Sequence, residues 1–252
     1  MRIDLNADLG ESFGPWPMGQ DEALMSSITS ANVACGFHGG DPSVMRRTVT
    51  AAIAHHVAIG AHPGFPDLVG FGRREMHATP SDVEDFVLYQ VAALAGIAAA
   101  QGARLQHVKA HGALYNMAVR DRALADAIAR ATAAFDRSLI LFGLPGSELL
   151  RAGERAGLRV ASEAFADRAY EPDGTLVSRK RAGSVIHDAD AVVARAVAMV
   201  TAGCVTAVDG SQLALQADTL CVHGDTPDSA ALARQVRKGL RAAGVNVLSL
   251  AV

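Results

Sequence analysis

Acidic, basic and histidine side chains gather just after short apolar runs along this 252-residue chain. Asp8 and Glu11 follow the first run, and Lys109 and His111 end the fourth. The pattern recurs at four other runs, which end in His38 with Asp41, in His62, in Glu163 with Asp167 and Arg168, and in His223 with Asp225. These groups can accept a proton, donate one, or hold negative charge, so the pattern indicates acid–base chemistry.

Each of these residues also has a structural explanation. Asp41 fits a helix cap, His223 could be a satisfied interior histidine, and Asp8 could hold a loop backbone. Six such clusters are harder to explain in this way than one. Asp8, His38 and His62 also form a possible ligand trio for zinc or a similar ion. No local H-x-x-x-H pair fixes their geometry.

Two loops carry glycines beside histidines, at residues 34–42 and 60–66. Glycine lets the backbone approach a ligand closely or take positive φ, and proline stiffens the return of the chain. Turn chemistry alone explains the glycines but not the neighbouring histidines.

The elements that must position these side chains alternate between strand and helix. Pro42, Pro80 and Pro227 each follow a cap candidate, namely Asp41, Thr79 and Thr226, which is a helix-start signal. The predicted strands are residues 3–8, 32–37, 58–62, 105–111, 139–143, 159–164 and 219–223, with 245–252 as a possible edge strand. Alternation of this kind predicts a parallel sheet. We expect an α/β fold: one domain over residues 1–252, a seven-stranded, TIM-like (β/α) barrel with the polar clusters at one mouth.

Segment 165–186 interrupts this rhythm, because it is long and charged and holds a predicted tight turn at Asp173-Gly174. We expect it to cover the barrel mouth, where Arg168, Arg179 and Lys180 would meet an anionic substrate.

The bulk composition narrows the function class. Lys plus Arg number 23 against 26 Asp plus Glu, a net charge of −3, which argues against a nucleic-acid footprint. The three cysteines have no C-x-x-C spacing and indicate reduced thiols. The N-terminus lacks a secretory signal pattern, and no apolar run approaches the length of a bilayer span. We expect a cytoplasmic protein that binds neither nucleic acid nor membrane.

Six motifs follow one another in a fixed order: NADLGESFG (6–14), NVACGFHGGDP (32–42), GAHPGFPDLVGFGRR (60–74), VKAHGALYN (108–116), EAFADRAYEPDGTLVSR (163–179) and CVHGDTP (221–227). Together they resemble the LamB/YcsF family. The family's fourth motif usually has proline where this chain has Ala110, a change that removes no functional group.

The resemblance implies a barrel related to the glycoside hydrolase/deacetylase superfamily. It also implies ATP-dependent opening of 5-oxoproline to glutamate, together with separate B and C subunits. The chain has no P-loop motif, so the question of which chain of such a complex binds ATP stays open. A metal-dependent carbohydrate deacetylase and a non-catalytic scaffold that binds partners are the alternatives.

The predicted site divides by role. Catalytic candidates are Asp8, Glu11, Lys109, His111 and His223. Substrate-binding candidates are Asn6, His38, His62, Glu163, Asp167, Arg168 and Asp225. We expect Lys109 and His111 to point together into the site, with Asp8, Glu11 and Glu163 as partners, because side chains two residues apart on a strand share a face.

Overall fold

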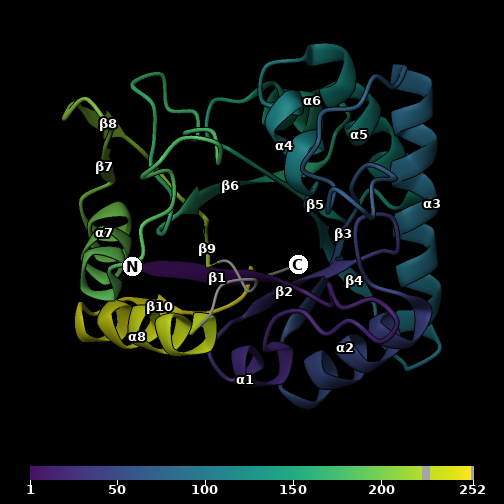
Figure 1. Ribbon diagram of the computed structural model, residues 1–252, viewed down its shortest axis with the longest axis horizontal. Helices are drawn as coiled ribbons and strands as arrows, with labels where there is room; N and C mark the ends of the chain where they lie inside the picture. Colours follow the sequence, from purple (N-terminus) through teal and green to yellow (C-terminus); the bar gives the residue numbers. More distant parts are fainter. Residues whose placement is uncertain (223–227, 251–252) are drawn as a thin grey trace.

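Seven parallel strands close into a barrel in the computed structural model, which describes residues 1–222 and 228–250. Around the barrel the order is β1 (Arg2–Leu9), β2 (Ser30–Ala34), β3 (Ala58–His62), β4 (Leu105–Val108), β5 (Ile140–Gly143), β6 (Arg159–Phe165) and β9 (Thr219–Cys221). Parallel pairing of β9 with both β6 and β1 closes the ring. The predicted seven-stranded (β/α) barrel is confirmed, and the helices surround the strands (Figure 1).

Strand ends differ from the prediction where glycine-rich loops take over. β2 ends at Ala34, so residues 35–37 belong to the following loop. β4 ends at Val108, and Lys109 and His111 lie in the connection to the next helix. The expected edge strand is reduced to β10 (Asn246–Val247), which pairs with the start of β1. The predicted end of the seventh strand, His223, lies outside the described residues.

The helix-start signals acted as expected in two cases. α2 (Pro42–Ala54) begins after Asp41, whose carboxylate accepts hydrogen bonds from the backbone N–H groups of Ser43 and Val44. α3 (Pro80–Ala99) begins with a capping box between Thr79 and Asp82. α8 (Ser229–Ala242) begins two residues later than predicted, after Asp228, and the proposed cap Thr226 lies outside the described residues.

The remaining helices are α1 (Asp21–Met25), α4 (Gly112–Ala118), α5 (Arg122–Phe135), α6 (Glu148–Arg155) and α7 (Ala189–Thr201). Among the described residues, no helix is long and apolar enough to cross a bilayer.

The interior of the barrel is largely polar. Along β1 the residues alternate, so that Asp4, Asn6 and Asp8 face inward, while Ile3, Leu5, Ala7 and Leu9 join the apolar core against the helices. Hydrogen bonds link the inward side chains of several strands into what we call the polar column: Asp4, Ser30, Thr219, Asn6, Asn32 and His107. Most (β/α) barrels instead fill this space with branched apolar side chains. The polar column therefore places hydrogen-bonding groups directly beneath the mouth.

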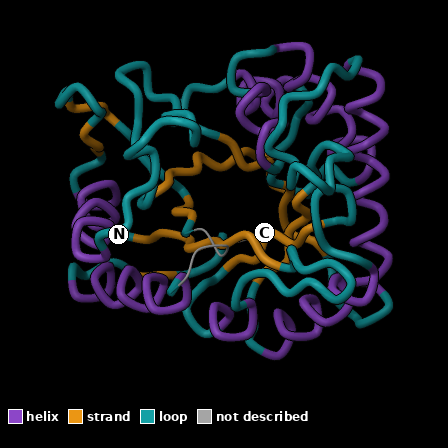
Figure 2. The backbone as a smooth tube through the Cα atoms, in the orientation of Figure 1, coloured by secondary structure: helices purple, strands orange, loops and turns teal. Residues whose placement is uncertain are grey.

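Segment 165–186 lies where the sequence predicted. Thr175 to Lys180 line a cavity together with Asp8 and Lys109, so the segment forms a wall of the barrel mouth. The predicted turn at Asp173-Gly174 is confirmed, because Tyr170 pairs with Leu176 and Glu171 with Thr175 across it. Further along, β7 (Cys204–Thr206) and β8 (Gln212–Ala214) form a small antiparallel hairpin outside the barrel (Figure 2).

Candidate active site

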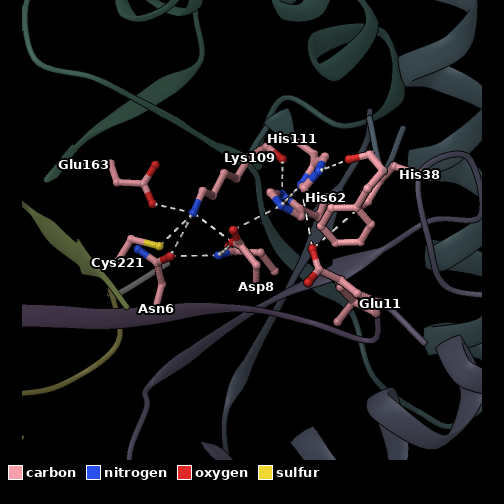
Figure 3. Close-up of polar contacts among 12 residues, drawn as sticks. Asn6, Asp8, Glu11, His38, His62, Lys109, His111, Glu163 and Cys221 are labelled. Atoms are coloured by element: carbon pink, nitrogen blue, oxygen red, sulfur yellow. Dashed lines mark hydrogen bonds and ion pairs between the residues drawn. The ribbon is translucent and has the colours of Figure 1, made fainter. Parts of the chain in front are cut away.

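Lys109 lies at the centre of the mouth and bridges two buried carboxylates. Its Nζ is 2.8 Å from Asp8 Oδ1 and 2.8 Å from Glu163 Oε1. Longer contacts reach Cys221 Sγ at 3.1 Å and Asn6 Oδ1 at 3.3 Å (Figure 3). The prediction that Lys109 faces Asp8 and Glu163 is confirmed.

The electrostatic surroundings keep Lys109 charged. Burial by itself lowers the pKa of this lysine, but nearby negative charge, chiefly on Asp8, outweighs burial and holds the pKa well above its usual value. Burial raises the pKa of the Cys221 thiol well above normal, so the thiol stays neutral beside the ammonium. The cluster contains two carboxylates for one cation and is a strongly polar site in a low-dielectric setting.

A second group adjoins the first through Asp8, whose Oδ2 is 3.4 Å from His62 Nε2. It consists of Glu11, His38, His62 and His111, all buried, with one ligand-type atom from each lying within 4.8 Å of the others. The rings of His38 and His111 stack at 3.7 Å with an interplanar angle of 3°. Glu11 Oε1 is 3.7 Å from a ring nitrogen of each. Glu11 was expected beside Lys109 and instead faces the histidines.

Hydrogen bonds define which ring nitrogens carry protons. His62 Nδ1 is 2.8 Å from the carbonyl of Lys109, and His111 Nε2 is 2.9 Å from the carbonyl of Phe71. A carbonyl only accepts, so these nitrogens are the donors. In neutral rings the lone pairs of His62 Nε2 and His111 Nδ1 then face each other at 2.9 Å. Such a pair needs a proton or a cation between the two nitrogens.

The third histidine points to the same need. Among the described residues, neither ring nitrogen of His38 has a hydrogen-bond partner, although the side chain is fully buried. Burial, followed by the nearby His62, lowers the pKa of His38 well below its usual value. Burial and the neighbouring histidines do the same for His111. Both rings are therefore neutral, as metal ligands must be.

These four residues could hold a metal ion, with three nitrogens and one carboxylate oxygen as donors. The predicted trio of Asp8, His38 and His62 needs a correction. Glu11 supplies the carboxylate of the group and His111 joins it, because Asp8 is held by Lys109 and by Asn32 at 2.9 Å.

Glycine makes the tight packing around these histidines possible. A Cβ on Gly72 would lie 2.8 Å from both His111 Cδ2 and His38 Cβ, and its φ of +62° disfavours other residues. The loop that bears Phe71 can therefore lie directly on the two rings.

A cavity of about 810 Å³ opens above both groups. Of the predicted site residues, Asp8, His62, Lys109, His111 and Arg168 line it. Other predicted residues lie one layer behind, in contact with lining residues or with their neighbours: Asn6, Glu11, His38 and Glu163. Asp167 is buried at the start of the wall segment. His223 and Asp225 lie outside the described residues.

Comparison with known proteins places this site in a family. The profile of the LamB/YcsF family matches residues 3–252. The chain belongs to the LamB/YcsF family. The 5-oxoprolinase A subunit from Bordetella pertussis is 57% identical over 245 residues, covering 97% of each chain. The protein of the same name from Methylococcus capsulatus is 58% identical over 248 residues, covering 98% of this chain and 95% of the other.

Solved structures agree with the LamB/YcsF assignment. A lactam utilization protein from Thermus thermophilus superposes with a TM-score of 0.94 at 50% identity, covering 99% of this chain and 100% of the other. A putative cellobiose-phosphate cleavage protein from Enterococcus faecalis has a TM-score of 0.59 at 14% identity, covering 98% of this chain and 97% of the other, a likeness of fold alone.

Two residues within the LamB/YcsF motifs were not predicted as site residues. Tyr115, in VKAHGALYN, lines the cavity, and burial followed by Glu163 raises its pKa well above normal. Arg73, in GAHPGFPDLVGFGRR, lines the same cavity. Both lie beyond strand ends, on a helix and in a loop, where strand periodicity gives no signal.

Proposed function

We propose that this chain carries the ring-opening site of an ATP-dependent 5-oxoprolinase, which converts 5-oxo-L-proline to L-glutamate. The observation that carries the proposal is Lys109, held between Asp8 and Glu163 at the base of a large cavity. The names of the relatives, 5-oxoprolinase and lactam utilization protein, support the lactam as substrate.

Ring opening breaks the bond between the lactam carbonyl carbon and its nitrogen. Water adds through oxygen to that carbon, and a proton must reach the departing nitrogen. Asp8 lines the cavity with a carboxylate oriented by Asn32 and Lys109, so it can take the proton from water and pass it to the nitrogen. Lys109 can turn from its longer contacts towards the developing oxyanion.

The histidine group fits a divalent metal ion held by Glu11, His38, His62 and His111. The supporting observations are the facing lone pairs of His62 and His111 and the nitrogens of His38 that lack a hydrogen bond. Such an ion would polarise the lactam carbonyl as a Lewis acid. The role expected for His111 changes accordingly from proton carrier to ligand, because its other nitrogen is committed to the carbonyl of Phe71.

ATP and the partner subunits complete the proposal. Hydrolysis of an unstrained lactam needs coupling, and the chain has no P-loop motif. The relatives are named as one lettered component of 5-oxoprolinase, which supports assembly with further subunits, here proposed as B and C. The isolated chain should therefore fold but turn over little 5-oxoproline.

The test is glutamate release from 5-oxoproline by the chain reconstituted with its B and C subunits, with and without ATP. Asp8→Asn should reduce turnover at least about a hundredfold, whereas Asp85→Asn, an exposed control on α3, should not change it. Full ATP-dependent turnover by the lone chain, or by the Asp8→Asn complex, would contradict the proposal. Acetate release from an N-acetylated oligosaccharide would favour a deacetylase instead.

The metal proposal has an independent readout. Protein purified without chelator should contain a stoichiometric divalent metal by elemental analysis. Glu11→Gln should lose most of it, and Glu75→Gln, which also lies on the mouth, should not. Equal metal content in both variants would reject the assignment of Glu11 as a ligand.

A further inference from the structure

The cavity is larger and more cationic than a small lactam requires. Its volume of about 810 Å³ lies near the top of the range of about 300–1,000 Å³ that holds drug-sized ligands. Among the described residues its lining has acidic side chains at Asp8 and Glu75. It has cationic ones, besides Lys109, at Arg73, Arg74, Arg120, Arg168, Arg179 and Lys180.

Two of these cations form ion pairs at the rim. Arg74 Nε is 2.9 Å from Asp67 Oδ1, and Arg120 contacts Asp173. Their charges are largely neutralised within the protein.

Three other guanidinium groups converge on the cavity, and we call Arg73, Arg168 and Arg179 the arginine cluster. Arg73 comes from the loop after β3, and Arg168 and Arg179 come from the wall segment after β6. β3 and β6 lie three strands apart in the seven-stranded ring, so the cluster closes on the cavity from opposite sides of the mouth.

Arg168 shows that positive charges are crowded together in the cluster. Its side chain is buried and donates to the carbonyls of Ser184, at 3.1 Å, and Val177, at 2.6 Å, both of which are neutral. Burial, followed by the charge of Arg179 and also that of Arg73, lowers the pKa of Arg168 to about 10, even though Asp167 opposes the shift. Like charges are held together here at a cost that a bound anion would offset.

We propose that the arginine cluster binds a phosphoryl group next to the lactam. A substrate carboxylate could engage one fork-shaped guanidinium, and three of them suit the several oxygens of a phosphoryl group. The same cavity is lined by Asp8, His62 and Lys109, so the phosphoryl group would lie beside the reacting carbonyl. Naming the lactam as its neighbour rests on the proposed function.

Two sources supply this chemistry, a nucleoside triphosphate bound here or a lactam phosphorylated elsewhere in the complex. Calorimetric titration of the purified chain with inorganic phosphate, pyrophosphate and the non-hydrolysable nucleotide AMP-PNP distinguishes them. Binding only of AMP-PNP indicates the nucleotide. Binding of phosphate itself, strengthened or unchanged by 5-oxoproline, indicates the phosphorylated lactam.

Arg73→Gln and Arg179→Gln should each weaken the bound anion about tenfold to a hundredfold, the usual value of a charged hydrogen bond. Arg104→Gln, an exposed arginine just before β4 and so at the opposite end of the barrel, is the matched control and should bind normally. Thermal melting of each variant checks that it folds, and Arg168→Lys keeps the charge of the anchored residue if its loss disturbs the loop.

Absence of binding by all three probes at millimolar concentration would overturn the proposal. So would unchanged affinity in both cluster variants, or strict competition between phosphate and 5-oxoproline, which would make the cluster a carboxylate site only. The proposed function fails separately: no glutamate release by the reconstituted complex would reject it and leave phosphate binding by the arginine cluster unaffected.

Discussion

Replacing Lys109 with methionine removes the ammonium while keeping a long unbranched side chain. Both carboxylates that Lys109 bridges are at most 9% exposed, and the lysine itself is 2% exposed. Removing one partner of a buried ion pair costs about 3–5 kcal/mol, because the remaining charge is left unpaired. We expect Lys109→Met to lower the free energy of unfolding by about this amount, unless Asp8 or Glu163 takes up a proton.

Turnover should fall further than this loss of stability explains. Loss of one donor to an oxyanion reduces turnover by about a hundredfold to a thousandfold. The assay is glutamate release by the reconstituted complex, measured well below the melting temperature of the variant. Lys238→Met, which removes an exposed lysine on α8, is the matched control and should match the wild type.

A double variant separates stability from chemistry. Lys109→Met with Glu163→Gln removes one of the two stranded carboxylates and should recover part of the lost stability, without recovering turnover. Near-normal turnover in either variant would refute the reasoning and remove Lys109 from the mechanism.

Replacing His107 with glutamine should flatten the stability curve in acid. Burial lowers the pKa of His107 to about 3, so between pH about 6.5 and 3 the unfolded chain binds the extra proton and the wild type loses about 1.4 kcal/mol per pH unit from this group. Urea titrations across that range give the slopes, and equal slopes in both proteins would contradict this account. Gly72→Ala should destabilise the protein by about 1–3 kcal/mol through its left-handed backbone and reduce metal content. Gly96→Ala on α3, where a Cβ meets nothing within 4 Å, should melt at the same temperature or higher. Tyr115→Phe should lower turnover about tenfold with little change in melting temperature, because it removes a buried, protonated hydroxyl beside Glu163. Unchanged kcat and KM in that variant would exclude the hydroxyl from the reaction.

The sequence predicted the residues whose positions depend on strand periodicity. Asp8 is the last inward position of β1, and Lys109 follows directly after β4, so alternation brings them together across the barrel. Barrel closure follows from the same repeat of strand and helix. These features depend on local patterns that extend over many residues, and the sequence shows them directly.

Residues beyond the strand ends were harder to place. Glu11 follows Gly10, whose φ of +69° turns the chain, and it therefore faces the histidines and not Lys109. His111 is the cap residue of α4 and no longer part of a strand, although its ring still reaches the site. Single φ values and loop contacts decide these positions, and residue type alone does not specify them.

The polar column inside the barrel limits how this sequence can diverge. Asn32 donates to Asn6 and to Asp8 and accepts from His107, so replacing Asn32 alone strands three partners. Each stranded buried group costs about 1–3 kcal/mol, and a whole domain has only about 5–15 kcal/mol to lose. Single neutral steps are therefore closed along the barrel axis, and inward positions must change in concert. New substrate preferences in such a lineage should arise in the loops of the mouth, while the column passes unchanged from ancestor to descendant.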